Sequence, residues 1–125
     1  MTDKELMTLA AKAAGYKLEW YSPEFGNDEP YKNGIYWNPL DDDGDALRLA
    51  VKLDMTVKAF PAGARVRFLN PILDICEIEE LSDSEIYTEE VRCSATRRAI
   101  VRAAAEVGKG MLSQDDFVLM FPEYN

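Results

Sequence analysis

Three stretches of the chain carry apolar residues at the spacing of an amphipathic helix. The first follows a capping box at 2–5 and stops at Gly15, a residue type that often ends helices. The second follows the acidic run 41–43, whose carboxylates can accept hydrogen bonds from first-turn amides, and the third spans 95–108. These patterns predict three helices. Their expected buried faces consist of Leu6, Leu9, Ala10, Ala13, Ala46, Leu47, Ala50, Val51, Leu53, Ala99, Ile100, Ala103, Ala104 and Val107.

Between these helices, apolar and polar residues alternate in the way that is typical of half-buried strands. The expected strands span 16–21, 34–37, 55–60, 64–69 and 86–93, and Ser94 is the expected cap of the third helix. Segment 72–78 has apolar residues on both faces and fits either a strand or a short helix. Residues 22–33 are expected to form a loop, and 79–85 an exposed acidic connection.

The order of these elements predicts an α+β fold. We expect a mostly antiparallel sheet with three amphipathic helices, layered as an α-β-α sandwich with helices on both faces. A chain of 125 residues is long enough for one core and too short for two, so we expect a single domain over 1–125. Residues 112–125 form a C-terminal apolar tail. This tail is either a last strand or a segment folded across the core, and its exposure would favour docking to a partner or a homodimer.

Composition narrows the possible partners. The formal net charge is −9 and the sequence pI is near 4.5, so phosphate backbones and anionic membranes repel the chain. The absence of histidine removes the usual general base near neutral pH. Cys76 and Cys93 lack the spacing of a metal or redox motif and are expected to be buried, reduced thiols. No signal-peptide core or bilayer-length apolar run is visible, so we expect a cytoplasmic protein without membrane contact.

The acidic run and Gly44 suggest a calcium loop, but their spacing argues against an EF-hand. With Gly44 at the invariant glycine position, the first and last ligand positions would fall on Pro39 and Ala50, which carry no carboxylate. A looser divalent-cation site stays open. Because helix capping already explains carboxylates at this position, we expect no metal and no cofactor.

Two segments together resemble a known family. They are WNPLDDDGDALRLAVKL at 37–53 and ATRRAIVRAAAEVGKGM at 95–111. The pair is similar to small phage and prophage proteins with an α-β-α sandwich domain of unknown function and, more distantly, to NinX-type phage proteins. The chain differs from them by a longer central segment, 70–90, and by the apolar tail. The resemblance implies this fold and a phage context, and it carries no catalytic residues to transfer.

Two functions of different classes follow. The first is a non-catalytic phage accessory protein that binds a host or phage protein. Its acidic surface either imitates phosphates to inhibit a host-defence or nucleic-acid enzyme or only keeps the chain in solution, and we favour the solubility interpretation of the charge. The alternative is nucleic-acid binding through Arg97, Arg98 and Arg102 on the last helix, with Arg65 and Arg67 completing the patch. We favour the first, because the acidic chain makes direct nucleic-acid binding unfavourable. No spacing fixes two carboxylates beside a pocket, so we expect no enzymatic activity.

The candidate interaction surface combines aromatic, acidic and basic residues. Antiparallel pairing of the strands at 16–21 and 34–37 would gather Trp20, Tyr21, Tyr36 and Trp37, either as cross-strand packing or as a ligand surface. The candidate residues are Phe25, Tyr31, Tyr36, Trp37, Asp41, Asp42, Asp43, Arg97, Arg98, Arg102, Phe117 and Phe121.

Overall fold

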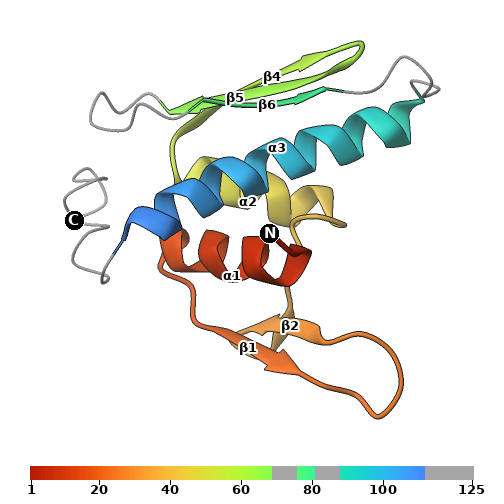
Figure 1. Cartoon of the computed structure of the whole chain (residues 1–125), viewed down its shortest axis with the longest axis vertical. Coiled ribbons are helices and arrows are strands. Elements are labelled where there is room, and N and C mark those ends of the chain that lie inside the picture. The colour runs from red at the N-terminus through yellow and green to blue at the C-terminus, as the bar shows by residue number, and fades with distance from the viewer. Residues whose placement is uncertain (69–75, 81–87, 112–125) are drawn as a thin grey trace.

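The protein is described here by a computed structural model, which covers residues 1–68, 88–111 and the backbone of 76–80 (Figure 1). This part of the chain contains three helices and six strands, so the predicted α+β class is confirmed. In chain order the elements are α1 (Asp3–Ala14), β1 (Leu18–Tyr21), β2 (Glu29–Lys32), β3 (Ile35–Tyr36), α2 (Asp43–Lys52), β4 (Met55–Phe60), β5 (Gly63–Phe68), β6 (Cys76–Glu80) and α3 (Glu89–Gly110).

The first helix has the ends that its sequence predicts. The Thr2 hydroxyl accepts a hydrogen bond from the Glu5 amide at 3.1 Å, and Gly15 ends the helix with a φ of 76°. Glycine adopts this left-handed conformation more readily than other residues, because glycine has no Cβ. The buried face of α1 is rich in alanine and packs mainly against α3.

The third helix starts earlier than its sequence predicts. Thr88 caps it, with its hydroxyl accepting from the Val91 amide at 3.2 Å, and Glu89 and Glu90 occupy the first turn. The prediction of a strand through Cys93 is therefore wrong for the described residues, and Ser94 is not the cap. The cap and the two acids favour a helix start. These signals outweigh the short alternation of apolar and polar residues that predicts a strand. Residues 86–87 lie outside the described part.

The described strands form two antiparallel sheets in place of one. In the first, β2 lies in the predicted loop and pairs with both β1 and β3, so the expected direct pairing of β1 with β3 is wrong. Asn33 and Gly34 make the two-residue turn between β2 and β3, with φ values of 51° and 79°. Asn-Gly is a strong hairpin signal, because both turn positions need positive φ.

The second sheet has the strand order β4-β5-β6. The hairpin of β4 with β5 is confirmed, with Phe60 opposite Gly63. The strand interpretation of 72–78 is confirmed for its described end, because β6 pairs antiparallel with β5. This strand continues through Glu80, so the exposed connection does not begin at residue 79.

The three helices lie between the two sheets (Figure 1). Helix α3 packs directly against the β4-β5-β6 sheet, and α1 packs against α3. The small β1-β2-β3 sheet lies at the other end of the molecule (Figure 1). The expected α-β-α layering is therefore not confirmed. The buried core joins the helices to the inner face of β5 through Ala64, Val66 and Phe68.

Candidate protein-docking groove

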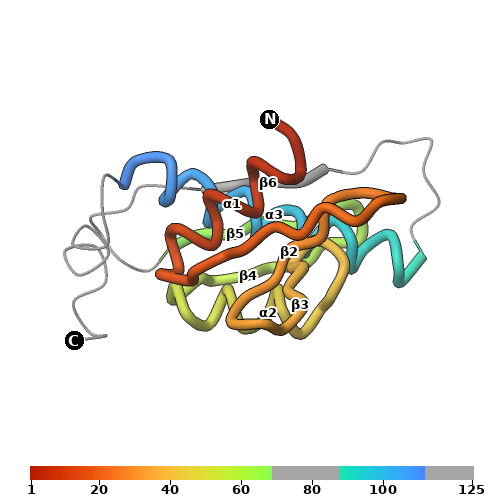
Figure 2. Tube along the Cα trace, turned by 90° about the horizontal axis from the view of Figure 1, so that it is seen from below, coloured from red at the N-terminus to blue at the C-terminus, as the bar shows by residue number. Residues whose placement is uncertain are grey.

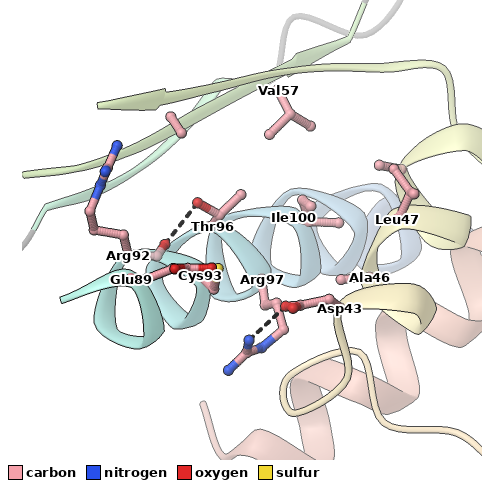
Figure 3. Close-up of a pocket in the computed structure, with 12 residues that line it drawn as sticks. Asp43, Ala46, Leu47, Val57, Glu89, Arg92, Cys93, Thr96, Arg97 and Ile100 are labelled. Carbon is pink, nitrogen blue, oxygen red and sulfur yellow. Dashed lines mark hydrogen bonds and ion pairs between the residues drawn. The ribbon is translucent and has the colours of Figure 1, made fainter. Parts of the chain in front are cut away.

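An open apolar groove lies between α2, α3 and the edge strand β4. Its volume is about 440 Å³, and its apolar lining is made by Ala46, Leu47, Ala50, Val57, Ala59 and Ile100. In Figure 3, Val57 points from its strand toward the helices, and Ile100 and Leu47 lie on the helices opposite it. A concave apolar surface that stays open to solvent is typical of a binding site.

Helix α2 is rotated about its axis relative to the orientation that its apolar pattern predicts, and this rotation opens the groove. Leu47 and Val51, expected in the core, are 63% and 65% exposed, whereas Leu49 is completely buried. Asp45 fixes this rotation, since its buried carboxylate accepts a hydrogen bond from the Asn38 amide at 3.0 Å and one from Arg48 at 2.8 Å. A buried carboxylate needs such partners. The side chains of Leu47 and Val51 are therefore left facing solvent.

Arg97 joins the two helix starts at one end of the groove. It was expected on the outside of α3, but it is only 6% exposed. Its guanidinium donates to the Leu40 carbonyl at 2.8 Å, to Asp43 at 2.7 Å and to Glu90 at 3.1 Å. Burial opposes its charge, but the hydrogen bonds to the two carboxylates outweigh burial and raise the pKa of Arg97 above its ordinary value.

Two exposed acidic segments, 41–43 and 89–90, reach this end of the groove, where Arg92 and Arg97 are also part of the lining. We call Asp41, Asp42, Asp43, Glu89 and Glu90 the acidic rim. Two members, Asp43 and Glu89, line the groove directly. Arg97 holds the two acidic segments together although they are far apart in sequence, as the dashed contact to Asp43 shows in Figure 3. The rim therefore combines two acidic runs that the sequence presents separately.

The carboxylates of the acidic turn have structural partners. Asp42 caps α2, accepting from the Asp45 amide at 2.8 Å, which confirms the capping interpretation. Asp41 accepts from the Asn38 side chain at 3.3 Å. Within the described residues, no three acidic or thiol side chains are placed to hold a metal ion.

The expected aromatic cluster is not formed. Trp37 is 4% exposed and packs edge-on against Tyr16 with a ring separation of 5.7 Å, so it belongs to the core and not to an interaction surface. Trp20 instead donates to the Thr8 hydroxyl at 3.2 Å. Tyr31, half-buried, packs against the exposed Tyr36. Cross-strand packing therefore explains the pair formed by Tyr31 and Tyr36.

The other predicted surface residues do not join the groove. Phe25 is exposed in the loop between β1 and β2. This loop lies at the end of the molecule away from β4 (Figure 1). Phe117, Phe121 and the side chain of Cys76 lie outside the described residues. Cys93 was expected to be buried, but it is a partly exposed free thiol that lines the groove.

The predicted arginine patch is wrong in its composition. Arg97 is buried, and Arg98 donates to Asp3 at 3.1 Å. Arg102 is half-buried and has an interaction of its own. Arg65 and Arg67 alternate with the buried inner residues of β5, so they lie on the face of the sheet opposite α3. One continuous patch from both elements is therefore not possible.

A smaller cleft lies between the β2–β3 hairpin and α2. Its volume is about 300 Å³, and Tyr16, Lys32, Trp37, Asp45 and Arg48 contribute to its lining. Burial raises the pKa of the Tyr16 hydroxyl, and the nearby Arg48 partly offsets this effect. Both cations are engaged, since Arg48 pairs with Asp45 and Lys32 lies 3.7 Å from the Tyr16 ring centroid. The apolar groove is therefore the stronger candidate.

No family model matches this sequence, and comparisons with curated proteins and with solved structures find no match. None of the helices in the described ranges is long and apolar enough to cross a membrane. The groove itself was missed from sequence because both Leu47 and Leu49 fit a helical apolar pattern. The useful signal was Asp45, a carboxylate on the side that α2 buries.

Proposed function

We propose that this chain is a non-catalytic accessory protein, of phage or prophage origin, that binds another protein through the groove between α2, α3 and β4. The observation that carries the proposal is the open apolar lining, with Leu47 on one wall and Val57 on the other. Removing such surface from water is the main driving force of protein association. The resemblance of 37–53 and 95–111 to small phage proteins supports the phage context.

The acidic rim supports a particular kind of target. The rim has five carboxylates, of which Asp43 and Glu89 line the groove, and they outnumber the lining arginines Arg92 and Arg97. This excess of negative charge favours a partner whose surface is basic, such as a nucleic-acid enzyme. Occupying that surface would inhibit the enzyme, as expected for a protein that counters a host defence. The alternative, direct binding of nucleic acid through α3, is less favoured because Arg97 is buried and paired with two acids.

The test is capture of host proteins by the tagged chain, with two matched charge variants. Leu47→Glu places a carboxylate in the groove, and Ile35→Glu places one on β3; the two side chains are 63% and 73% exposed. Both variants should therefore fold. A partner that uses the groove binds the wild-type chain and Ile35→Glu but is lost from Leu47→Glu.

Salt dependence separates the two parts of the proposed surface. Binding directed by the acidic rim weakens as ionic strength rises, because exposed charges are screened over about 8 Å at physiological salt. Binding that Leu47→Glu leaves unchanged contradicts the groove as the site. Binding that persists at high salt but is lost in Leu47→Glu would leave the groove as the site and exclude the basic-surface target.

A further inference from the structure

The helix layer extends past the β4 edge of the second sheet. Helix α3 contacts β4, β5 and β6, whereas α2 contacts this sheet chiefly at β4. Figure 2 shows α2 on the β4 side of the sheet, away from β6. Packed helices lie about 10 Å apart, roughly twice the spacing of strands, so two helices side by side cover about four strands. The described sheet supplies three of them.

Within the described residues, the open side of this sheet lies beside β4. In the described part of the chain, β4 pairs with β5 along one edge only, so the backbone amides and carbonyls of its other edge have no strand partner there. Leu47 and Val51 of α2 are exposed on this side of the molecule, and Leu47 lines the groove. A strand placed here would find hydrogen-bonding groups beside it and apolar side chains below it.

The side chains of β4 indicate what such a strand would carry. Val57 and Ala59 line the groove, while Thr56 and Lys58 alternate with them on the other face. An added strand continues this alternation, so every second residue would point toward Leu47 and the helices. Apolar residues suit those positions, and polar residues suit the outer ones.

Charge selects among the possible occupants. Asp43 and Glu89 of the acidic rim line the end of the groove together with Arg92 and Arg97. The five rim carboxylates outnumber these two arginines, so this end of the groove attracts lysine or arginine and repels carboxylates. Residues 112–125 contain the acids Asp115, Asp116 and Glu123 and no basic residue, so this segment is unfavourable there. A second copy is also unfavourable, because each chain carries a net charge of −9.

We propose that β4 accepts an extended segment of a partner protein as a fourth strand, and that this segment alternates apolar residues and carries basic residues near the acidic rim. Strand addition of this kind takes affinity from backbone hydrogen bonds and specificity from alternate side chains. The inference rests on the proposed function, because it names the chemistry of the partner at the same groove.

The probes are three synthetic peptides of about eight residues, long enough to span β4. All alternate valine with threonine. The first has lysines at both ends, the second has glutamates there, and the third is the lysine peptide with N-methyl groups on alternate residues of the edge that faces β4. Fluorescence polarisation with the full chain measures binding. The lysine peptide should bind roughly tenfold tighter than either of the others.

A glutamate peptide that binds as well as the lysine peptide overturns the charge argument, and an N-methylated peptide that binds as well overturns strand pairing. Leu47→Glu should abolish binding of the lysine peptide, and Ile35→Glu should retain it. If the lysine peptide fails while captured partners still depend on Leu47, this inference is wrong and the proposed function stands.

Two further results would assign the groove to another occupant and overturn the proposal. One is binding of the lysine peptide only after Phe117→Ser and Phe121→Ser, which would place the chain's own C-terminal segment in the groove. The other is a dimer in analytical ultracentrifugation that Leu47→Glu dissociates and Ile35→Glu does not, which would place a second copy there.

Discussion

The two halves of α3 meet their neighbours in opposite ways. The C-terminal half is closely packed, and its small residues Ala103, Ala104 and Gly108 are all buried. At Gly108 the approach is so close that an added Cβ would overlap with the Leu9 carbonyl oxygen. The N-terminal half contributes Cys93, Thr96 and Ile100 to the lining of an open groove.

This difference separates residues that hold the fold from residues available to a partner. Close packing leaves little room for any change in side-chain volume. The exposed side chains of the groove, such as Leu47 and Val57, tolerate substitution because they already contact solvent. Under the proposed function, the same helix serves stability at its C-terminal end and binding at its N-terminal end. Substitutions in the closed region should change unfolding, whereas those at exposed groove residues such as Leu47 should change binding alone.

Two leucines of α2 give the largest expected contrast. Leu49 is completely buried and Leu47 is largely exposed, although they are two residues apart. Leu49→Ala should lower the free energy of unfolding by about 3 kcal/mol, because it removes buried methyl groups and leaves a cavity. Leu47→Ala should change it by less than about 0.5 kcal/mol. Urea unfolding of both variants measures the difference, and equal losses would contradict the assigned rotation of α2.

The rotation of α2 also shows how much of the fold can be predicted from the sequence. The caps of α1, the capping carboxylate of α2 and the β4–β5 hairpin follow from local rules, and the structure confirms them. The inward face of α2 does not follow from its apolar pattern, because Leu47 and Leu49 fit that pattern equally well. The hydrogen bond from the Asn38 amide to Asp45 decides between them, and it depends on tertiary contact.

The candidate groove could not be predicted from the sequence for a related reason. It depends on β4 being an edge strand and on the acids at 41–43 meeting Glu89 and Glu90 through Arg97. An arginine on a helix is usually interpreted as a solvated side chain. Nothing in the apolar pattern of α3 shows that Arg97 is buried or that it pairs with Asp43 at the start of α2.

The second prediction tests the close approach of α1 and α3. Gly108→Ala should lower the free energy of unfolding by about 2 kcal/mol, because the new methyl group meets the α1 backbone, which cannot move aside easily. Gly110→Ala is the matched control, since a Cβ there meets nothing within 4 Å. Alanine is favoured over glycine within helices, so the control should be neutral or slightly stabilising. Thermal and urea unfolding would check both, and a stabilised Gly108→Ala would mean that the helices are not in close contact.

The third prediction concerns Arg97, which links the two acidic segments at the end of the groove. Arg97→Met should lower the free energy of unfolding by about 2 kcal/mol, because the Leu40 carbonyl loses its charged donor. Arg98→Met removes a surface pair with Asp3 and should cost less than about 0.5 kcal/mol. Arg97→Met should also weaken groove binding, because Asp43 and Glu90 are no longer held together. If it left both stability and binding unchanged, Arg97 would not organise the rim.

The smallest expected effect lies on the outer face of α1, where Lys4 binds Asp28 at 2.7 Å. Hydrogen bonds from Lys4 and then from Ser22 hold the pKa of Asp28 below its ordinary value of 3.8. A carboxyl group with a lowered pKa in the folded state stabilises the protein above its ordinary pKa, and this contribution is lost as pH falls through the folded-state value. Asp28→Asn should therefore lower stability slightly near neutral pH and reduce the loss of stability below about pH 4. Urea unfolding across this pH range measures the change, with Glu24→Gln in the same loop as the control. Because Asp28 is exposed, a large effect would mean that the outer face of α1 contributes to the fold in the way that its closed inner face does.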